Sequence, residues 1–332
     1  MSTTDAEVTG MSSTQQADET LVKSYRYLRT AMVGLVLCLA VAVIHQSLKQ
    51  GTILSSISAY YFTSAQSIFV GALIAIGVCM VALRGTTDTD DILLNIGGML
   101  APVVAVVPTA RIKDLHKILS ACRESDGATF VDPVIKDVDC PTVQALEAVT
   151  EANVANNMLA LLVVAYVGLV ATLLFARRDR LPIARFRVGF GIAVGIVALV
   201  SLVFFAFPDL FVQVAHYAAA IPMFGCIVLV VIINSVRHQE VQARGSGMGP
   251  RIKQGATALA RPQDGYARIA VAMLAAVVIG GALAAAGTFE DTIFWLEATL
   301  ILLFGAFWVV QTREQWDVDP CAPKQGRVPE AV

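Results

Sequence analysis

The chain alternates between long apolar runs and short polar segments. A helix that crosses a bilayer needs about 20 mostly apolar residues, with a range of roughly 17–25. Eight runs meet this requirement, at about 30–48, 67–83, 92–108, 156–177, 188–207, 212–234, 267–287 and 292–310. The pattern therefore predicts an all-α fold: a polytopic transmembrane helical bundle of about eight spans.

The composition agrees with this class. The chain of 332 residues is 56% hydrophobic and only 15% charged, whereas a soluble domain of this length needs far more polar surface. The predicted partner is thus the lipid bilayer. The formal net charge of −2 gives no sign of nucleic-acid binding.

Lys and Arg residues predict the orientation, because they accumulate in cytoplasmic loops. They gather in 23–29, 177–187 and 237–261, which share one side if there are eight spans. We therefore expect a multi-pass protein of the cell membrane with both termini in the cytoplasm. The expected segments are a disordered cytoplasmic tail over 1–29, a transmembrane domain over 30–312 and a cytoplasmic tail over 313–332.

The long outer loop, 109–155, has a helical apolar pattern at both ends, which predicts a small extracytoplasmic helical cap. It contains Cys122 and Cys140, and disulfides persist outside the cytoplasm. A bridge between them would contribute roughly 3 kcal/mol by the chain-entropy estimate. The alternative is two free thiols.

Polar side chains within the predicted spans collect at one depth. Ionisable groups inside a membrane are costly and usually mark function. In the outer half of the bilayer lie His45 in the first span, His216 in the sixth, Glu297 in the eighth, and a hydroxyl-rich stretch over 55–67. The residues expected to line an outward-facing polar pocket and to bind its ligand are Ser56, Ser58, Tyr60, Tyr61, His216, Glu297 and His45.

Simpler interpretations stay open beside the pocket. Ser and Thr at the start of a helix often cap free N–H groups, and Tyr60 and Tyr61 are typical of an aromatic belt at the membrane interface. His216 and Glu297 could hydrogen-bond to each other and serve only to hold two spans together.

Catalytic and cofactor motifs give little support to an enzyme. A metallohydrolase needs about three His or carboxylate ligands, and no HExxH or HxxxH spacing is present. We expect no metal and no cofactor. The leading hypothesis is a non-enzymatic sensor, receptor or transport-related protein that binds a small ligand or lipid headgroup. The alternatives are a membrane-embedded hydrolase using His216 and Glu297, and a structural subunit of a membrane complex.

One resemblance adds to this interpretation. The chain reads SISAYYFTSAQSIFVGALIAIGVCMVALRG, then VAHYAAAIPMF, then IFWLEATLILLFGAFWVV. These segments resemble a family of uncharacterised bacterial multi-pass membrane proteins with a Ser-x-Ser-x-Tyr-Tyr start of a span, a His in a later span and a Glu in the last span. The matching positions are Ser56, Ser58, Tyr60, Tyr61, His216 and Glu297. The resemblance implies membrane location and no known activity.

Overall fold

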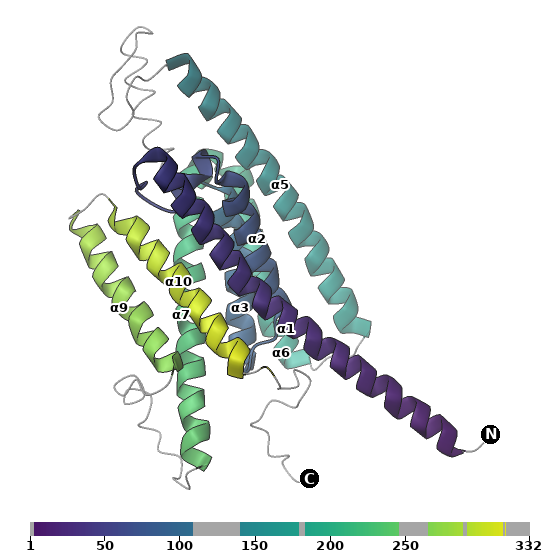
Figure 1. Cartoon of the computed structure of the whole chain (residues 1–332). Coiled ribbons are helices and arrows are strands. Elements are labelled where there is room, and N and C mark those ends of the chain that lie inside the picture. Colours follow the sequence, from purple (N-terminus) through teal and green to yellow (C-terminus); the bar gives the residue numbers. More distant parts are fainter. Residues whose placement is uncertain are drawn as a thin grey trace.

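The computed structural model is all-helical over the residues it describes (Figure 1). It describes the backbone of residues 3–108, 140–178, 183–245, 265–287, 291–314 and 316, and side chains within those ranges except 3–18, 140–149, 183–186 and 239–245. The elements are α1 (Thr3–Gln50), the 3-10 helix η1 (Ser58–Phe62), α2 (Gln66–Ala82), α3 (Asp88–Val106), α5 (Cys140–Arg178), α6 (Ile183–Ala206), α7 (Pro208–Gly245), α9 (Gly265–Ala285) and α10 (Thr292–Glu314).

The helices have the length and composition of membrane spans. Seven are long and apolar enough to cross a bilayer, and α2 is a shorter apolar helix. The prediction of an all-helical membrane protein is confirmed at this level. Each of the eight predicted apolar runs falls on one helix, with ends that differ by one or two residues where the run extends beyond it. Helices suit a bilayer because they satisfy their own backbone hydrogen bonds.

Five helices form the centre of the bundle. α2 packs against α1 and α3, α3 packs against α7, and α10 packs against α1 (Figure 1). α9 covers α7 and α10, whereas α5 and α6 lie on the α3 and α7 side with apolar surfaces that remain exposed, such as Val164 and Leu199. These exposed apolar faces suit contact with lipid.

Glycines explain the closest helix contact, between α2 and α3. A Cβ atom on Gly77 would lie 2.6 Å from the carbonyl oxygen of Gly98, and one on Gly98 would lie 2.6 Å from the carbonyl oxygen of Gly77. Such an approach of two backbones requires that both residues lack side chains. Gly98 in the apolar run 92–108 therefore allows α3 to pack closely against α2.

The acidic segment before α3 is also explained by helix structure. Thr87 and Asp90 form a capping box at the start of α3, and Asp90 is fully buried. The Thr86 hydroxyl bonds to Asp90 and lies 3.3 Å from the side-chain oxygen of Asn234 on α7. Carboxylates favour a helix N-terminus because its free N–H groups carry partial positive charge. The acidic residues of this segment therefore stabilise the N-terminus of α3, although the segment lies at the basic end of the molecule.

The segment 1–29, expected as a disordered tail, contributes to helix α1 in its described part. α1 runs back to Thr3 without interruption, and side chains are described from Glu19. Tyr25 and Leu28 pack against the core, and the Arg26 Nε–H donates to the carbonyl oxygen of Trp316 at 2.6 Å. These contacts with the end of α10 continue the helix beyond the apolar run.

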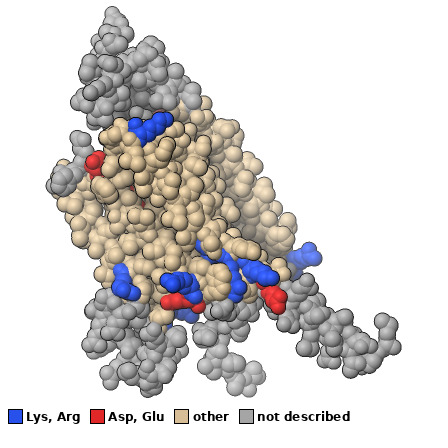
Figure 2. All heavy atoms as spheres, viewed as in Figure 1, with Lys and Arg blue, Asp and Glu red and all other residues tan. Residues whose placement is uncertain are grey.

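Basic side chains concentrate at one end of the bundle (Figure 2). Of the eleven Lys and Arg residues with described side chains, ten lie at the end where α1 begins, and Lys49 lies at the other. The ten are Lys23, Arg26, Arg29, Arg84, Arg177, Arg178, Arg187, Arg237, Arg268 and Arg313. The helix directions therefore agree with the basic stretches that the sequence groups together.

Two expectations lie outside the described residues. The cap over 109–155 falls mostly in the undescribed range 109–139, and neither Cys122 nor the side chain of Cys140 is described. Among the described cysteines, Cys38, Cys79 and Cys226 are free thiols within helices. The bridge between Cys122 and Cys140 stays a prediction.

The α2–α3 contact generates a stability prediction. Gly98→Ala should lower the free energy of unfolding by about 1–3 kcal/mol, because the new methyl group overpacks against backbone and Val81. Gly71→Ala is the matched control, since it lies on α2 with nothing within 4 Å, and it should be neutral or stabilising by up to about 1 kcal/mol. Thermal unfolding in detergent measures both. Equal midpoints for the two variants would contradict the close contact.

Candidate ligand-binding cavity

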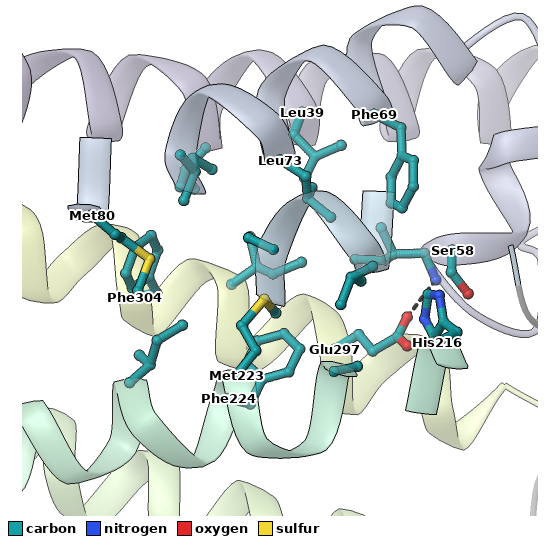
Figure 3. A pocket seen from close by; sticks show the side chains of 18 residues that line it. Leu39, Ser58, Phe69, Leu73, Met80, His216, Met223, Phe224, Glu297 and Phe304 are labelled. Carbon is teal, nitrogen blue, oxygen red and sulfur yellow. Dashed lines mark hydrogen bonds between the residues drawn. The ribbon is translucent and has the colours of Figure 1, made fainter. Parts of the chain in front are cut away.

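An internal cavity of about 60 Å³ lies within the central helices. This is several times the ~10–15 Å³ that one water molecule needs. Its 18 lining residues come from α1, η1 and the residue before it, α2, α3, α7 and α10 (Figure 3). They are Val36, Leu39, Ile57, Ser58, Phe69, Leu73, Ile76, Met80, Ala101, Val104, His216, Ala220, Met223, Phe224, Ile227, Glu297, Ile301 and Phe304.

The cavity has a polar end and an apolar body. Figure 3 shows Ser58, His216 and Glu297 together at one end, with Met80 and Phe304 at the other. These three are the lining residues with polar side-chain groups. Along α7 the lining runs from His216 to Ile227, which is about 16 Å at 1.5 Å per residue. This is roughly half of the ~30 Å hydrocarbon core of a bilayer.

Glu297 fastens the loop between α1 and α2 to α10. Its Oε2 accepts the Ile57 N–H at 2.7 Å, and the Ser58 N–H also approaches the carboxyl group. In return, the Phe294 N–H at the start of α10 donates to the Ser55 carbonyl oxygen at 3.0 Å. The first amides of a helix have no partner within it. The loop and α10 therefore satisfy each other's free backbone groups.

His216 has the equivalent role at the end of α3. Its Nδ1 lies 2.6 Å from the carbonyl oxygen of Val107, the residue after the last turn of α3, and the Val104 carbonyl is also close. A carbonyl oxygen only accepts, so Nδ1–H is the donor and sets the tautomer. In the neutral ring, Nε2 then carries no proton and can only accept a hydrogen bond.

The mutual hydrogen bond expected between His216 and Glu297 does not form among the described contacts. Both side chains line the same end of the cavity, yet each bonds to the backbone of a neighbouring element. Free backbone groups at helix ends are numerous and must be paired in an apolar interior. His216 and Glu297 therefore hydrogen-bond to backbone groups and not to each other.

Most hydroxyl groups of the stretch 55–67 with a described partner hydrogen-bond within the stretch or to α1. The Ser56 and Ser58 hydroxyls are 2.9 Å apart, and Ser56 Oγ accepts the N–H of Ala59 in the first turn of η1 at 3.1 Å. The Tyr60 hydroxyl bonds to Ser47 on α1. Ser56 thus satisfies a free N–H group, as the capping interpretation expects. Of the four hydroxyl residues predicted to bind the ligand, which are Ser56, Ser58, Tyr60 and Tyr61, only Ser58 lines the cavity.

Tyr60 and Tyr61 do not form an interfacial belt. They are 0% and 3% exposed, and the Tyr60 ring packs on Phe294 with ring centroids 6.2 Å apart. Burial raises the pKa of Tyr61, although its hydrogen bond to Gln66 opposes the shift. Trp295 is 58% exposed, as a belt residue would be.

His45 is separated from this group. It is exposed on α1 and is not a lining residue, whereas its neighbour Gln46 is buried and accepts the Ser64 hydroxyl at 2.6 Å. One residue rotates a helix by about 100°, so the two side chains point in different directions. The spacing of Gln46 from Val36, Leu39 and Val43 marks the buried face of α1 and could have identified it in place of His45.

The lining residues that keep accessible surface lie on α7 and α10. Four lining residues keep accessible surface: Ala220, Phe224, Glu297 and Ile301. All four belong to these two helices, and every lining residue from the other elements is buried. On the same part of α7, Ile221 is 70% exposed. The cavity therefore approaches the apolar flank of the bundle.

The described side chains do not form a metal site. Within the described part of the chain, no three His, Cys, Asp or Glu residues gather closely enough to hold a metal ion. His216 and Glu297 are thus a pair without a third ligand of these types in that region. The chemistry that the cavity offers is hydrogen bonding at one end and apolar contact along the rest.

Comparison with protein-family models, with curated proteins and with solved structures finds no match. The interpretation of the cavity therefore depends on its own geometry.

The clamp at Glu297 can be tested by substitution. Glu297→Leu should lower the free energy of unfolding by about 1–3 kcal/mol, because it leaves a buried backbone donor without an acceptor. Glu297→Gln keeps a carbonyl oxygen for the Ile57 N–H and should lose less. Thr299→Leu is the control, since it makes a similar change at an exposed position of α10. If thermal unfolding of Glu297→Leu matched that of the control, Glu297 would not hold the loop.

Proposed function

We propose that this protein is a non-enzymatic membrane receptor, sensor or transport-related protein that holds a small ligand or lipid headgroup in the cavity. The observation that carries the proposal is the grouping of Ser58, His216 and Glu297 at one end of an otherwise apolar cavity. Polar groups inside a bilayer protein are costly and are retained for packing or for function. Here His216 and Glu297 can serve both purposes, because they hydrogen-bond to backbone groups of neighbouring elements and also line the cavity.

The proposal includes eight spans, with α2 as the short one. α2 runs antiparallel to α3 and packs along it (Figure 1). With eight spans, the ten basic residues at one end support a cytoplasmic location for that end and for both termini, in a cell membrane. The polar end of the cavity then lies in the outer half of the bilayer, beneath the proposed outer cap over 109–155 and its Cys122–Cys140 bridge.

The proposed relation to the bacterial multi-pass family is consistent with this site. Ser58, His216 and Glu297 line the polar end, and Ser56 bonds to Ser58. Tyr60 and Tyr61 hold the same segment in place through buried contacts. The motif that carries the resemblance thus describes one structural unit.

The topology is tested by labelling single cysteines in intact cells. Lys49→Cys and Arg313→Cys, each in a chain without the six native cysteines, place exposed thiols at opposite ends of the bundle. A maleimide that cannot cross membranes should label the cysteine at 49 and should reach the one at 313 only after permeabilisation. The reverse pattern would overturn the orientation.

Ligand retention tests the function. Ala220→Leu places a larger side chain into the cavity, whereas Ala218→Leu makes the same change on the exposed face of α7. We expect native mass spectrometry of the purified protein to show a bound small molecule that Ala220→Leu loses and Ala218→Leu keeps.

Two outcomes would contradict the proposal. Identical spectra for wild type and both variants, with no retained small molecule, would show that the cavity holds no ligand. Protein subunits that co-purify at fixed ratio from all three chains, again without a small molecule, would favour a structural subunit of a membrane complex.

A further inference from the structure

The body of the cavity fits a hydrocarbon chain better than water. Fifteen of its 18 lining residues are apolar, and among them are Phe69, Phe224 and Phe304. Apolar cavities of this kind stay dry and accept apolar guests, since a bound water needs two to four polar partners. Its length of about 16 Å corresponds to one leaflet of the bilayer. The occupant is therefore narrow, apolar over most of its length and parallel to the helices.

The polar end offers mostly hydrogen-bond acceptors. The Nδ1–H of His216 is already donated to Val107, which leaves Nε2 of the neutral ring as an acceptor. Ile57 occupies one lone pair of Glu297, and the carboxyl oxygens have others. The Ser58 hydroxyl is engaged with Ser56. A ligand head that donates hydrogen bonds would complement these groups, whereas an anionic head would meet a carboxyl group.

The accessible side indicates where the ligand comes from. Ala220 and Phe224 on α7 and Ile301 on α10 keep accessible surface, and Ile221 beside Ala220 is 70% exposed on the apolar flank of α7. The outer end is covered instead by the buried residues Ile57 and Ser58. A molecule dissolved in the bilayer reaches such an opening directly.

We infer that the ligand is a single-chain amphiphile drawn from the membrane, with a hydroxyl or ammonium head at His216 and Glu297 and a hydrocarbon tail that ends near Met80 and Phe304. This inference rests on the proposed binding function and adds the class and direction of the ligand. One chain fits the narrow apolar body, and the head supplies the donors that the polar end lacks.

Photo-labelling with matched probes tests this inference. Dodecanol, dodecylamine and dodecanoate, each with a diazirine at the end of the tail, share one chain and differ in the head. They are added to the full chain in lipid nanodiscs, irradiated and mapped by mass spectrometry of peptides. Labelling that Ala220→Leu abolishes and Ala218→Leu preserves is labelling of the cavity.

The alcohol and the amine should label peptides containing Met80, Ile227 or Phe304, and dodecanoate should label them at least ~10-fold less, because a carboxylate head supplies no donor to an end that already offers acceptors. Glu297→Gln keeps an acceptor for Ile57 and replaces the other carboxyl oxygen with an amide N–H₂ donor, so it should reduce labelling by the amine and increase labelling by dodecanoate. Preference for dodecanoate in the wild type, equal labelling by all heads, or tail labelling near Phe69 would overturn the inference while leaving a binding cavity. Absence of any labelling sensitive to Ala220→Leu would instead overturn the proposed function.

Discussion

The bundle depends on hydrogen-bond partners for the free backbone groups at helix ends that lie inside an apolar medium. α3 ends at Val106 and η1 begins at Ser58, so both leave backbone groups without partners in their own helix. His216 supplies a donor to the first and Glu297 an acceptor to the second. Each bond joins elements distant in sequence, and an unpaired buried group would cost about 1–3 kcal/mol.

The cavity follows from the same arrangement. The loop between α1 and α2 turns inward because its amides reach Glu297, and it closes one end of the space between α2, α7 and α10. The apolar side chains below it come from helices held at this distance by the polar clamps. Structural and ligand-binding roles for His216 and Glu297 are therefore compatible, because bonding through one atom leaves another available to the cavity.

Much of the fold is predictable from the sequence, since hydropathy locates the apolar part of each of the eight described α-helices and Lys and Arg residues indicate their directions. The grouping of Ser58, His216 and Glu297 is also predictable, because polar side chains are costly inside a membrane and these three lie at a similar depth along their predicted spans. Their bonding partners are not, because carbonyl and N–H groups freed at helix ends do not appear in a residue pattern. Depth alone selects His45, although the helical phase of Gln46 marks a different face of α1 as the buried one. The helix over 19–29 depends on a contact with Trp316 that only the folded chain forms.

The most direct test of the account is amide hydrogen exchange of the wild-type protein in nanodiscs, compared within one loop. The account predicts that the Ile57 amide, held by Glu297, exchanges as slowly as the amides of the central helices. The exposed residues Gly51 and Thr52 of the same loop should exchange far faster. Rapid exchange at Ile57, equal to that at Gly51 and Thr52, would show that the clamp is absent and that the cavity has no fixed polar end.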